Sequence, residues 1–148
     1  MKEMRVSWRE FESLTDKLCE KIKRKNENFD NIICIATGGL ILGKLVSEKL
    51  TLPLGIISMK AYEDKKLKKL KFDKHISTTK KVDGSVLLID DIADSGTSLR
   101  TAFNYLVSYK GIKKVKTATL FNKPSSSFIP HYFVKETSDW VVFPYEKS

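Results

Sequence analysis

Apolar residues recur along the chain at two spacings, one typical of amphipathic helices and one of buried strands. Between Ser7 and Lys25 they return every three or four positions, as on one face of a helix. Ser7 and Glu10 form a capping box that marks where this helix begins. Two further helices are predicted over about Leu40–Leu50 and Thr97–Tyr109.

Short continuous apolar runs predict strands that are buried on both faces. They cover Ile32–Ala36, Leu54–Met59, Val86–Asp90 and Val115–Phe121, with two shorter runs at Tyr132–Val134 and Trp140–Phe143. Helices that alternate with such strands indicate βαβ units. The expected fold is therefore α/β, a mainly parallel sheet flanked by helices, with ligands beyond the carboxyl ends of the strands. No repeat or linker divides the sequence, so we expect one domain over residues 1–148.

The segment Ala61–Lys74 fits neither spacing. It is polar and rich in lysine, with Lys65, Lys66, Lys68, Lys69, Lys71 and Lys74 close together. Because no apolar period is sharp enough for a core element, we predict a mobile loop here.

Composition narrows the function classes. The net charge of +9 raises the possibility of nucleic-acid binding, but aromatic residues do not alternate with the clustered lysines as a base-stacking surface would require, which argues against it. A basic loop beside a phosphate-rich substrate, or a solvated lysine surface, explains these lysines as well. No apolar run approaches the roughly 20 residues of a membrane span and the N-terminus lacks a signal-peptide core, so we expect no membrane association and a cytoplasmic protein. Cys19 and Cys34 are predicted to be buried free thiols.

Chemistry-bearing residues gather directly after the strand Val86–Asp90. Its end carries two adjacent carboxylates, Asp90 and Asp91, and a loop of Asp94, Ser95, Gly96, Thr97 and Ser98 then runs into a helix. Unpaired N–H groups at a helix start bind phosphate, and a glycine lets the backbone come close to it. The acid pair suits sugar hydroxyls or Mg²⁺ instead. A ribose 5-phosphate offers both kinds of partner.

A second loop, Thr37-Gly38-Gly39, lies between a predicted strand and the next helix. Paired glycines allow a tight turn that exposes backbone N–H groups, so this loop can form a cradle for pyrophosphate.

The stretch Val86–Leu99 strongly resembles the signature of the type I phosphoribosyltransferases, which use phosphoribosyl pyrophosphate (PRPP) with Mg²⁺. The resemblance implies that Asp94–Ser98 bind the 5′-phosphate, and that Asp90 and Asp91 bind the ribose and Mg²⁺, directly or through water. It implies that Thr37, Gly38 and Gly39 bind pyrophosphate, with a cis peptide bond between Ala36 and Thr37, although family members commonly carry Arg or Lys where this chain has Thr37.

The same resemblance implies a flexible loop that closes over the reacting centre. Family members place a Ser-Tyr pair there; this chain has Ala61 in place of the serine, which leaves Tyr62 as the candidate, with Lys65 and Lys66 among the lysines that could reach pyrophosphate.

Two C-terminal stretches, Leu120–Pro124 and Ser138–Glu146, resemble the base-binding elements of the 6-oxopurine phosphoribosyltransferases, above all the xanthine-guanine enzymes. This implies a small C-terminal base-binding hood in which Lys123 donates to the purine O6, Trp140 stacks on the base and the Val141 backbone meets its N1 and C2 edge.

The expected activity is transfer of the 5-phosphoribosyl group from PRPP to N9 of guanine, xanthine or hypoxanthine, giving a nucleoside monophosphate and pyrophosphate in purine salvage. The family implies Mg²⁺ as cofactor, Asp94 as the catalytic group that exchanges the purine N7 proton, and a homodimer or homotetramer. Two alternatives stay open. One is a regulator of the same fold that binds a nucleotide effector and nucleic acid; the other is a phosphoribosyltransferase for adenine, orotate or uracil.

Overall fold

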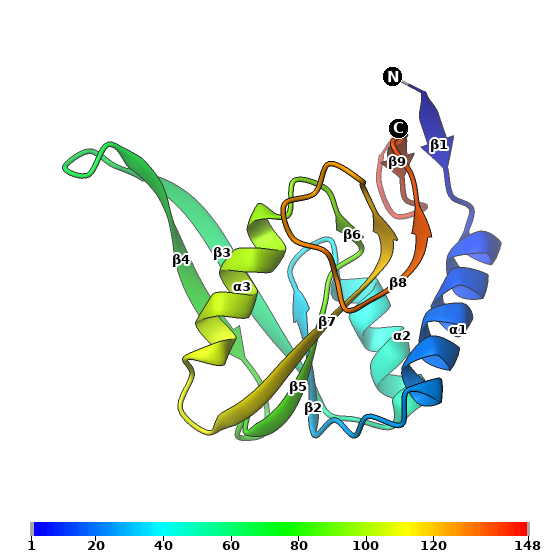
Figure 1. Ribbon diagram of the computed structural model, residues 1–148, viewed down its shortest axis with the longest axis horizontal. Helices are drawn as coiled ribbons and strands as arrows, with labels where there is room; N and C mark the ends of the chain where they lie inside the picture. Colours follow the sequence, from blue (N-terminus) through cyan, green and yellow to red (C-terminus); the bar gives the residue numbers. More distant parts are fainter. Residues whose placement is uncertain (1, 148) are drawn as a thin grey trace.

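The computed structural model describes residues 2–147 and has a seven-stranded sheet at its centre (Figure 1). The strand order is β4-β3-β2-β5-β7-β6, and β8 also pairs with β7. The strands are β2 (Asn31–Ile35), β3 (Leu54–Asp64), β4 (Lys69–Ser77), β5 (Gly84–Ile89), β6 (Ile92–Ala93), β7 (Ile112–Asn122) and β8 (Tyr132–Glu136). All neighbouring strands are parallel except the antiparallel pair β3 and β4. The predicted α/β fold with a mainly parallel sheet is confirmed.

Helices cover both faces of the sheet. They are α1 (Trp8–Arg24), α2 (Leu40–Leu50) and α3 (Thr97–Val107). Side chains of β5 alternate between two cores, because successive residues of a strand point to opposite faces. Leu87 and Ile89 pack with residues of α1 and α2, whereas Val86 and Leu88 pack with residues of α3. The strand that leads to the acid pair is thus buried on both sides.

The start of α1 follows the predicted cap. The backbone N–H of Glu10 donates to Oγ of Ser7 at 3.1 Å, which satisfies one donor of the first turn. Cys19 on α1 and Cys34 on β2 are buried free thiols, as predicted. In residues 2–147, no helix is long and apolar enough to cross a membrane.

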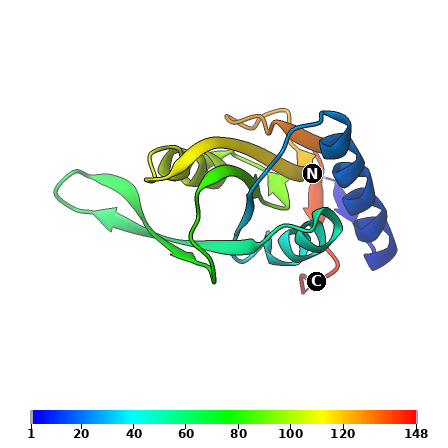
Figure 2. The same cartoon turned by 90° about the horizontal axis from the view of Figure 1, so that it is seen from below.

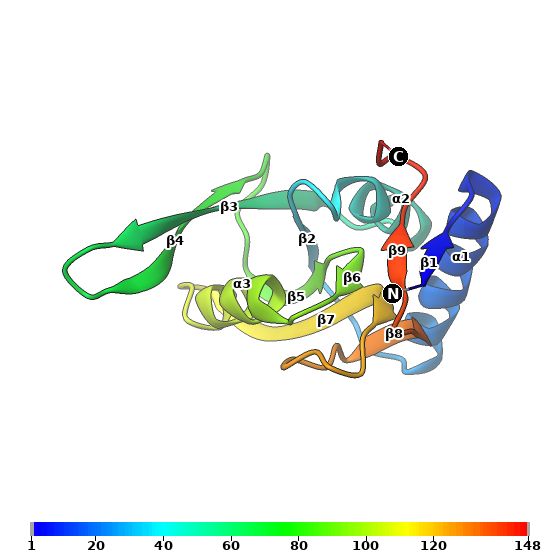
Figure 3. The same ribbon diagram turned by 90° about the horizontal axis from the view of Figure 1, so that it is seen from above.

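A second, two-stranded sheet stands beside the carboxyl ends of the main sheet (Figure 3). It pairs β9 (Trp140–Val142) with β1 (Glu3–Arg5), a strand that the sequence pattern does not predict. Backbone bonds extend the pair at both ends, from Trp140 N to Lys2 O at 2.8 Å and from Val6 N to Val142 O at 2.9 Å. The predicted C-terminal hood therefore includes an N-terminal strand.

The prediction of a loop over Ala61–Lys74 is wrong, because most of these residues lie in strands. β3 and β4 form a long hairpin whose pairing runs from Ile56 opposite Ser77 to Asp64 opposite Lys69. At the turn, the Asp64 carboxylate accepts the N–H groups of the two residues 66 and 67 at 3.0 and 3.1 Å. The hairpin projects from the body of the protein (Figures 1 and 2), so much of it needs no apolar face and shows no burial pattern.

Candidate active site

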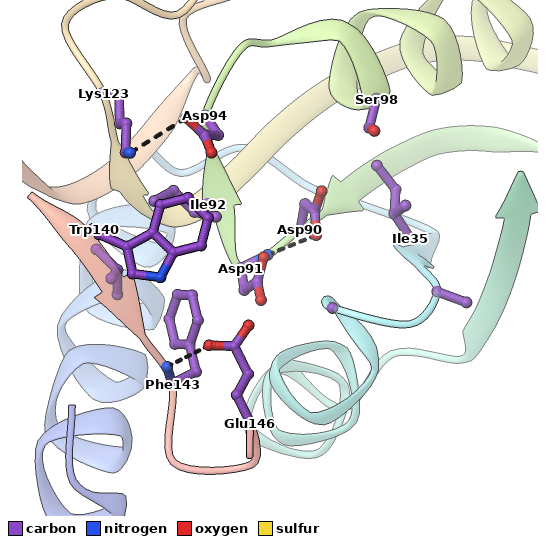
Figure 4. A pocket seen from close by; sticks show the side chains of 13 residues that line it. Ile35, Asp90, Asp91, Ile92, Asp94, Ser98, Lys123, Trp140, Phe143 and Glu146 are labelled. Atoms are coloured by element: carbon purple, nitrogen blue, oxygen red, sulfur yellow. Dashed lines mark hydrogen bonds and ion pairs between the residues drawn. The ribbon is translucent and has the colours of Figure 1, made fainter. Parts of the chain in front are cut away.

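A cavity of about 320 Å³ lies beyond the carboxyl ends of β2 and β5. It brings together residues that the sequence predicts from four separate segments: Gly38, Asp90, Asp91, Asp94, Ser98, Lys123, Trp140 and Val141. Figure 4 shows Lys123, Asp94 and Trp140 on one side of this cavity and Ser98 on the other, with the two adjacent aspartates between them. The cavity therefore has three distinct parts.

The middle part is the acid pair. Asp90 and Asp91 are both buried, and the N–H of Asp91 donates to Oδ1 of Asp90 at 2.9 Å. Burial, together with the neighbouring Asp91 charge, raises the pKa of Asp90 well above its usual range, and burial also raises the pKa of Asp91. Charged carboxylates are costly in this position without a partner, so the pair favours a ligand that brings a cation or hydroxyl donors.

The phosphate side is a hollow of about 190 Å³ lined by Asp94, Ser95, Gly96 and Ser98 among others. Gly96 is the N-cap of α3, and no side chain of the described residues caps this helix start. The first N–H groups of α3 are left open toward an anion, apart from that of Thr97, which donates to Oγ of Ser95 at 3.3 Å. The predicted phosphate loop thus has the geometry of an anion site.

Gly96 has a packing role in addition to the one expected of it. Its φ of +89° suits glycine, but a Cβ at this position would meet Phe128 N at 2.7 Å and Ser126 Oγ at 2.8 Å. The missing side chain makes room for the loop after β7 as well as for any ligand, so Gly96 is required by packing within the protein.

The turn after β2 contains the expected cis peptide bond between Ala36 and Thr37. Gly38 lines the cavity, and a Cβ on it would lie 3.0 Å from Oδ2 of Asp91. Gly39 is buried and donates its N–H to Ile35 O at 2.8 Å, so it has no free N–H for pyrophosphate. Within this turn, Gly38 and the exposed Thr37 stay the residues predicted to bind pyrophosphate.

The third part of the cavity combines a buried cation with an exposed aromatic ring. Lys123 is buried, and its Nζ lies 3.4 Å from Oδ1 of Asp94 and 5.5 Å from the centroid of the Trp140 ring. The Trp140 side chain is 55% exposed, so one face of the indole is available to a planar ligand. Val141, on the same strand β9, lines the cavity next to it.

The hairpin residues lie apart from this arrangement. Tyr62 is on β3, while Lys65 and Lys66 are in the turn between β3 and β4, and none of the three lines the cavity. Figure 1 shows the tip of this hairpin extending away from the hood formed by β1 and β9. The predicted contact of these residues with a ligand stays a prediction.

Two further residues of the site follow Pro144. The hydroxyl of Tyr145 donates to Oδ2 of Asp91 at 2.7 Å. Glu146 lines the cavity and accepts the N–H of Phe143 at 2.8 Å. The segment lies in a predicted base-binding element, but neither residue was predicted to have a role of its own. An aromatic residue and an acid directly after a proline were the available signal.

This chain belongs to the phosphoribosyltransferase family, because the model of the phosphoribosyl transferase domain matches residues 6–146. Among solved structures, it is similar to a purine phosphoribosyltransferase from Pyrococcus horikoshii, with a TM-score of 0.86, 30% identity, and coverage of 100% of this chain and 97% of the other.

Two curated relatives differ in the base named for them. The chain is 26% identical to a xanthine-guanine phosphoribosyltransferase of Idiomarina loihiensis, over 98% of this chain and 88% of the relative. It is 36% identical to an orotate phosphoribosyltransferase of Sulfurisphaera tokodaii, but over 68% of this chain and only 47% of that protein. The family is therefore established, and the base must be argued from the site.

Proposed function

We propose that this protein transfers the 5-phosphoribosyl group of PRPP to N9 of a 6-oxopurine, releasing pyrophosphate and a nucleoside monophosphate for purine salvage. The observation that carries the proposal is the order of the three parts of the cavity. The start of α3, which would bind phosphate, lies on one side of the cavity, and the acid pair lies in the middle. The buried Lys123 and the exposed Trp140 lie on the other side.

The donor set also fits Mg²⁺. Within the described part of the chain, no three His, Cys, Asp or Glu side chains gather as a metal cage. Asp90 and Asp91 offer two carboxylates at one edge of the cavity, which suits an ion that keeps several waters and shares its shell with a phosphate-rich substrate. When bound, Mg²⁺ would neutralise charge on the departing pyrophosphate.

The protein groups would mainly orient the reactants and exclude water. N9 of the purine would attack C1′ as pyrophosphate leaves, with inversion at that carbon. Asp94 lies beside Lys123 at the base end of the cavity, where its carboxylate could exchange the purine N7 proton. N–H groups at the start of α3 would hold the 5′-phosphate in place throughout.

Lys123 favours an oxopurine over adenine. An ammonium group only donates hydrogen bonds, so it matches the O6 carbonyl of guanine, xanthine and hypoxanthine and not the 6-amino group of adenine. Burial of Lys123 strengthens this preference, because a buried ammonium that faces another donor gains no hydrogen bond from the base and keeps only its ion pair with Asp94.

The test is nucleotide formation from guanine, xanthine, hypoxanthine, adenine, orotate and uracil, each with PRPP and Mg²⁺. We expect turnover with at least one 6-oxopurine and at most traces with the other three bases. Turnover with orotate, uracil or adenine alone would overturn the choice of base. Binding of nucleotides without any turnover would instead favour a regulator of the same fold. Asp94→Asn should lower kcat far more than it weakens PRPP binding, because the carboxylate acts on the base.

A further inference from the structure

The hydroxyl of Tyr145 reaches between two loops of the cavity. It lies 2.7 Å from Oδ2 of Asp91 and 3.1 Å from the carbonyl oxygen of Gly38, and these two acceptors share its single proton. Gly38 and Asp91 follow β2 and β5, which are neighbouring strands of the sheet. One hydroxyl therefore links the turn after β2 to the acid pair.

The direction of this hydroxyl is fixed by packing of the tyrosine ring. The ring is stacked on Phe143, with centroids 5.5 Å apart, and it meets the edge of Phe11 at 5.6 Å and Trp8 at 6.2 Å. Phe11 and Trp8 belong to α1, so the ring is held between that helix and the segment after β9. A phenylalanine at position 145 would keep these contacts and lose only the hydroxyl.

The two linked loops have little freedom to adjust on their own. Gly38 is already so close to Asp91 that a Cβ would lie 3.0 Å from the carboxylate. A buried carboxylate holds one orientation only when hydrogen-bond donors surround it. Tyr145 donates a side-chain hydrogen bond to Asp91 from a segment distant in the sequence.

We propose that Tyr145 is a positioning residue for PRPP, which sets the orientation of Asp91 and its spacing from the pyrophosphate turn without acting on the purine. This inference rests on the proposed function, since PRPP is the ligand whose two ends the linked loops would bind. Tyr145 follows the strand that carries Trp140 and Val141, but its proposed role concerns the binding of PRPP and not of the purine.

The test is calorimetric binding of PRPP in the presence of Mg²⁺ to Tyr145→Phe, together with steady-state kinetics. We expect the Kd for PRPP to rise by roughly tenfold or more, the loss associated with a hydrogen bond to a charged group. The purine KM at saturating PRPP should stay within about twofold of the wild-type value, because the variant leaves Lys123, Trp140 and Val141 unchanged.

Tyr132→Phe is the matched control. The hydroxyl of Tyr132 also donates to a carboxylate, that of Glu27, but this pair lies outside the cavity. The control should lower the melting temperature and leave the Kd for PRPP unchanged. A change of PRPP binding in Tyr132→Phe as large as that in Tyr145→Phe would show a general effect of stability and overturn the inference.

A double-mutant cycle with Asp91→Asn tests whether Tyr145 acts through Asp91. If it does, Tyr145→Phe should change PRPP binding much less in the Asp91→Asn background than in the wild-type protein. Unchanged PRPP affinity of Tyr145→Phe, an equal rise of the purine KM, or loss of folding in this variant would each overturn the inference. A wild-type protein that binds no PRPP would refute the proposed function itself, and this inference with it.

Discussion

Ser127 is joined to Ser95 by two hydrogen bonds. Its backbone N–H and its hydroxyl both donate to the carbonyl oxygen of Ser95, each at 2.9 Å. The guanidinium of Arg100 donates to the carbonyl of Ser127 and also lies over the ring of Phe128, 5.6 Å from its centroid. The loop that begins with Lys123 at the base end of the cavity is thus fastened to the phosphate loop. Arg100 is only two residues after Ser98 of the phosphate loop, but its side chain contacts the loop after β7 and not the phosphate hollow.

This attachment makes Gly96→Ala a test of packing at the phosphate loop. The new Cβ would meet the backbone N of Phe128 at 2.7 Å, so the loop must move. We expect the free energy of unfolding to fall by about 1–2 kcal/mol for the left-handed backbone and by about 1–3 kcal/mol more for the crowding. Chemical denaturation measures the loss, and the affinity for PRPP should fall as well.

Gly111→Ala separates these two contributions. Gly111 has a similar φ of +96°, but a Cβ there would be in ordinary contact, 3.5 Å from the nearest atom. This variant should show only the cost of the backbone conformation and normal PRPP binding. Equal losses of stability in the two variants would refute the crowding argument for Gly96.

The sequence pattern predicts the elements that are buried and periodic. The bounds of α2, Leu40–Leu50, agree with the prediction residue for residue, and β2 and β5 lie within about two residues of their predicted runs. Both kinds of element bury a continuous face, so their spacing of apolar residues is dictated by the core. The cluster at the end of β5 was predicted from its chemistry, since two adjacent acids followed by a third acid and a loop of small polar residues combine partners for hydroxyls, a cation and phosphate at the carboxyl end of a strand.

Features that depend on distant partners could not be predicted in this way. β1 has only three residues and is defined by its pairing with β9, at the other end of the chain. Tyr145 and Asp91 are 54 positions apart, and Ser127 and Ser95 are 32 apart, so no local pattern relates them. The part of the hairpin that extends beyond the body lacks an apolar face, and its ladder of backbone hydrogen bonds leaves no mark in the side-chain pattern.

Asp90→Asn should stabilise the protein while it impairs activity. The raised pKa of Asp90 means that the folded protein binds more protons than the unfolded chain between the usual value of 3.8 and the raised one, so the stability of the wild type falls as pH rises through this window. The asparagine carries no charge and its Oδ1 can still accept the N–H of Asp91. The variant should therefore have the higher free energy of unfolding at pH 7, and this advantage should disappear below the usual carboxyl pKa.

Denaturation at several pH values and activity assays check this prediction. Activity with PRPP should drop on the order of 100-fold, as when a group that stabilises charge in the transition state is removed. Asp73→Asn, on the exposed surface of the hairpin, should change neither quantity. A variant that is less stable than the wild type at pH 7 would contradict the cost assigned to the buried charge.

The hairpin prediction concerns Lys65 and Lys66 at the turn. Both side chains are exposed and make no packing contact that the fold needs, so replacing both by alanine should leave the melting temperature unchanged. If the hairpin closes on the cavity during turnover, the loss of these cations should raise the KM for pyrophosphate in the reverse reaction by roughly tenfold. Lys110→Ala, at another exposed turn, is the control. An unchanged KM for pyrophosphate would exclude a role for the hairpin tip.

Lys123→Ala is the most direct test of the base site. Lys123 combines an ion pair to Asp94 at 3.4 Å with a position 5.5 Å from the Trp140 ring, and we expect its removal to weaken 6-oxopurine binding by about 1.5–3 kcal/mol. Lys114→Ala is a close match, because Lys114 pairs with Glu27 at 3.2 Å and lies 5.2 Å from the Phe29 ring, outside the cavity.

The two lysine variants should differ in kind as well as in degree. Lys123→Ala should raise the purine KM and leave PRPP binding nearly normal, whereas Lys114→Ala should leave both unchanged. Trp140→Ala should weaken purine binding by about 1–3 kcal/mol through lost stacking, and it should fold normally because more than half of this side chain is exposed. A purine KM that is the same in Lys123→Ala and in the wild type would remove the main argument for a 6-oxopurine, since the O6 carbonyl would then be recognised by another group.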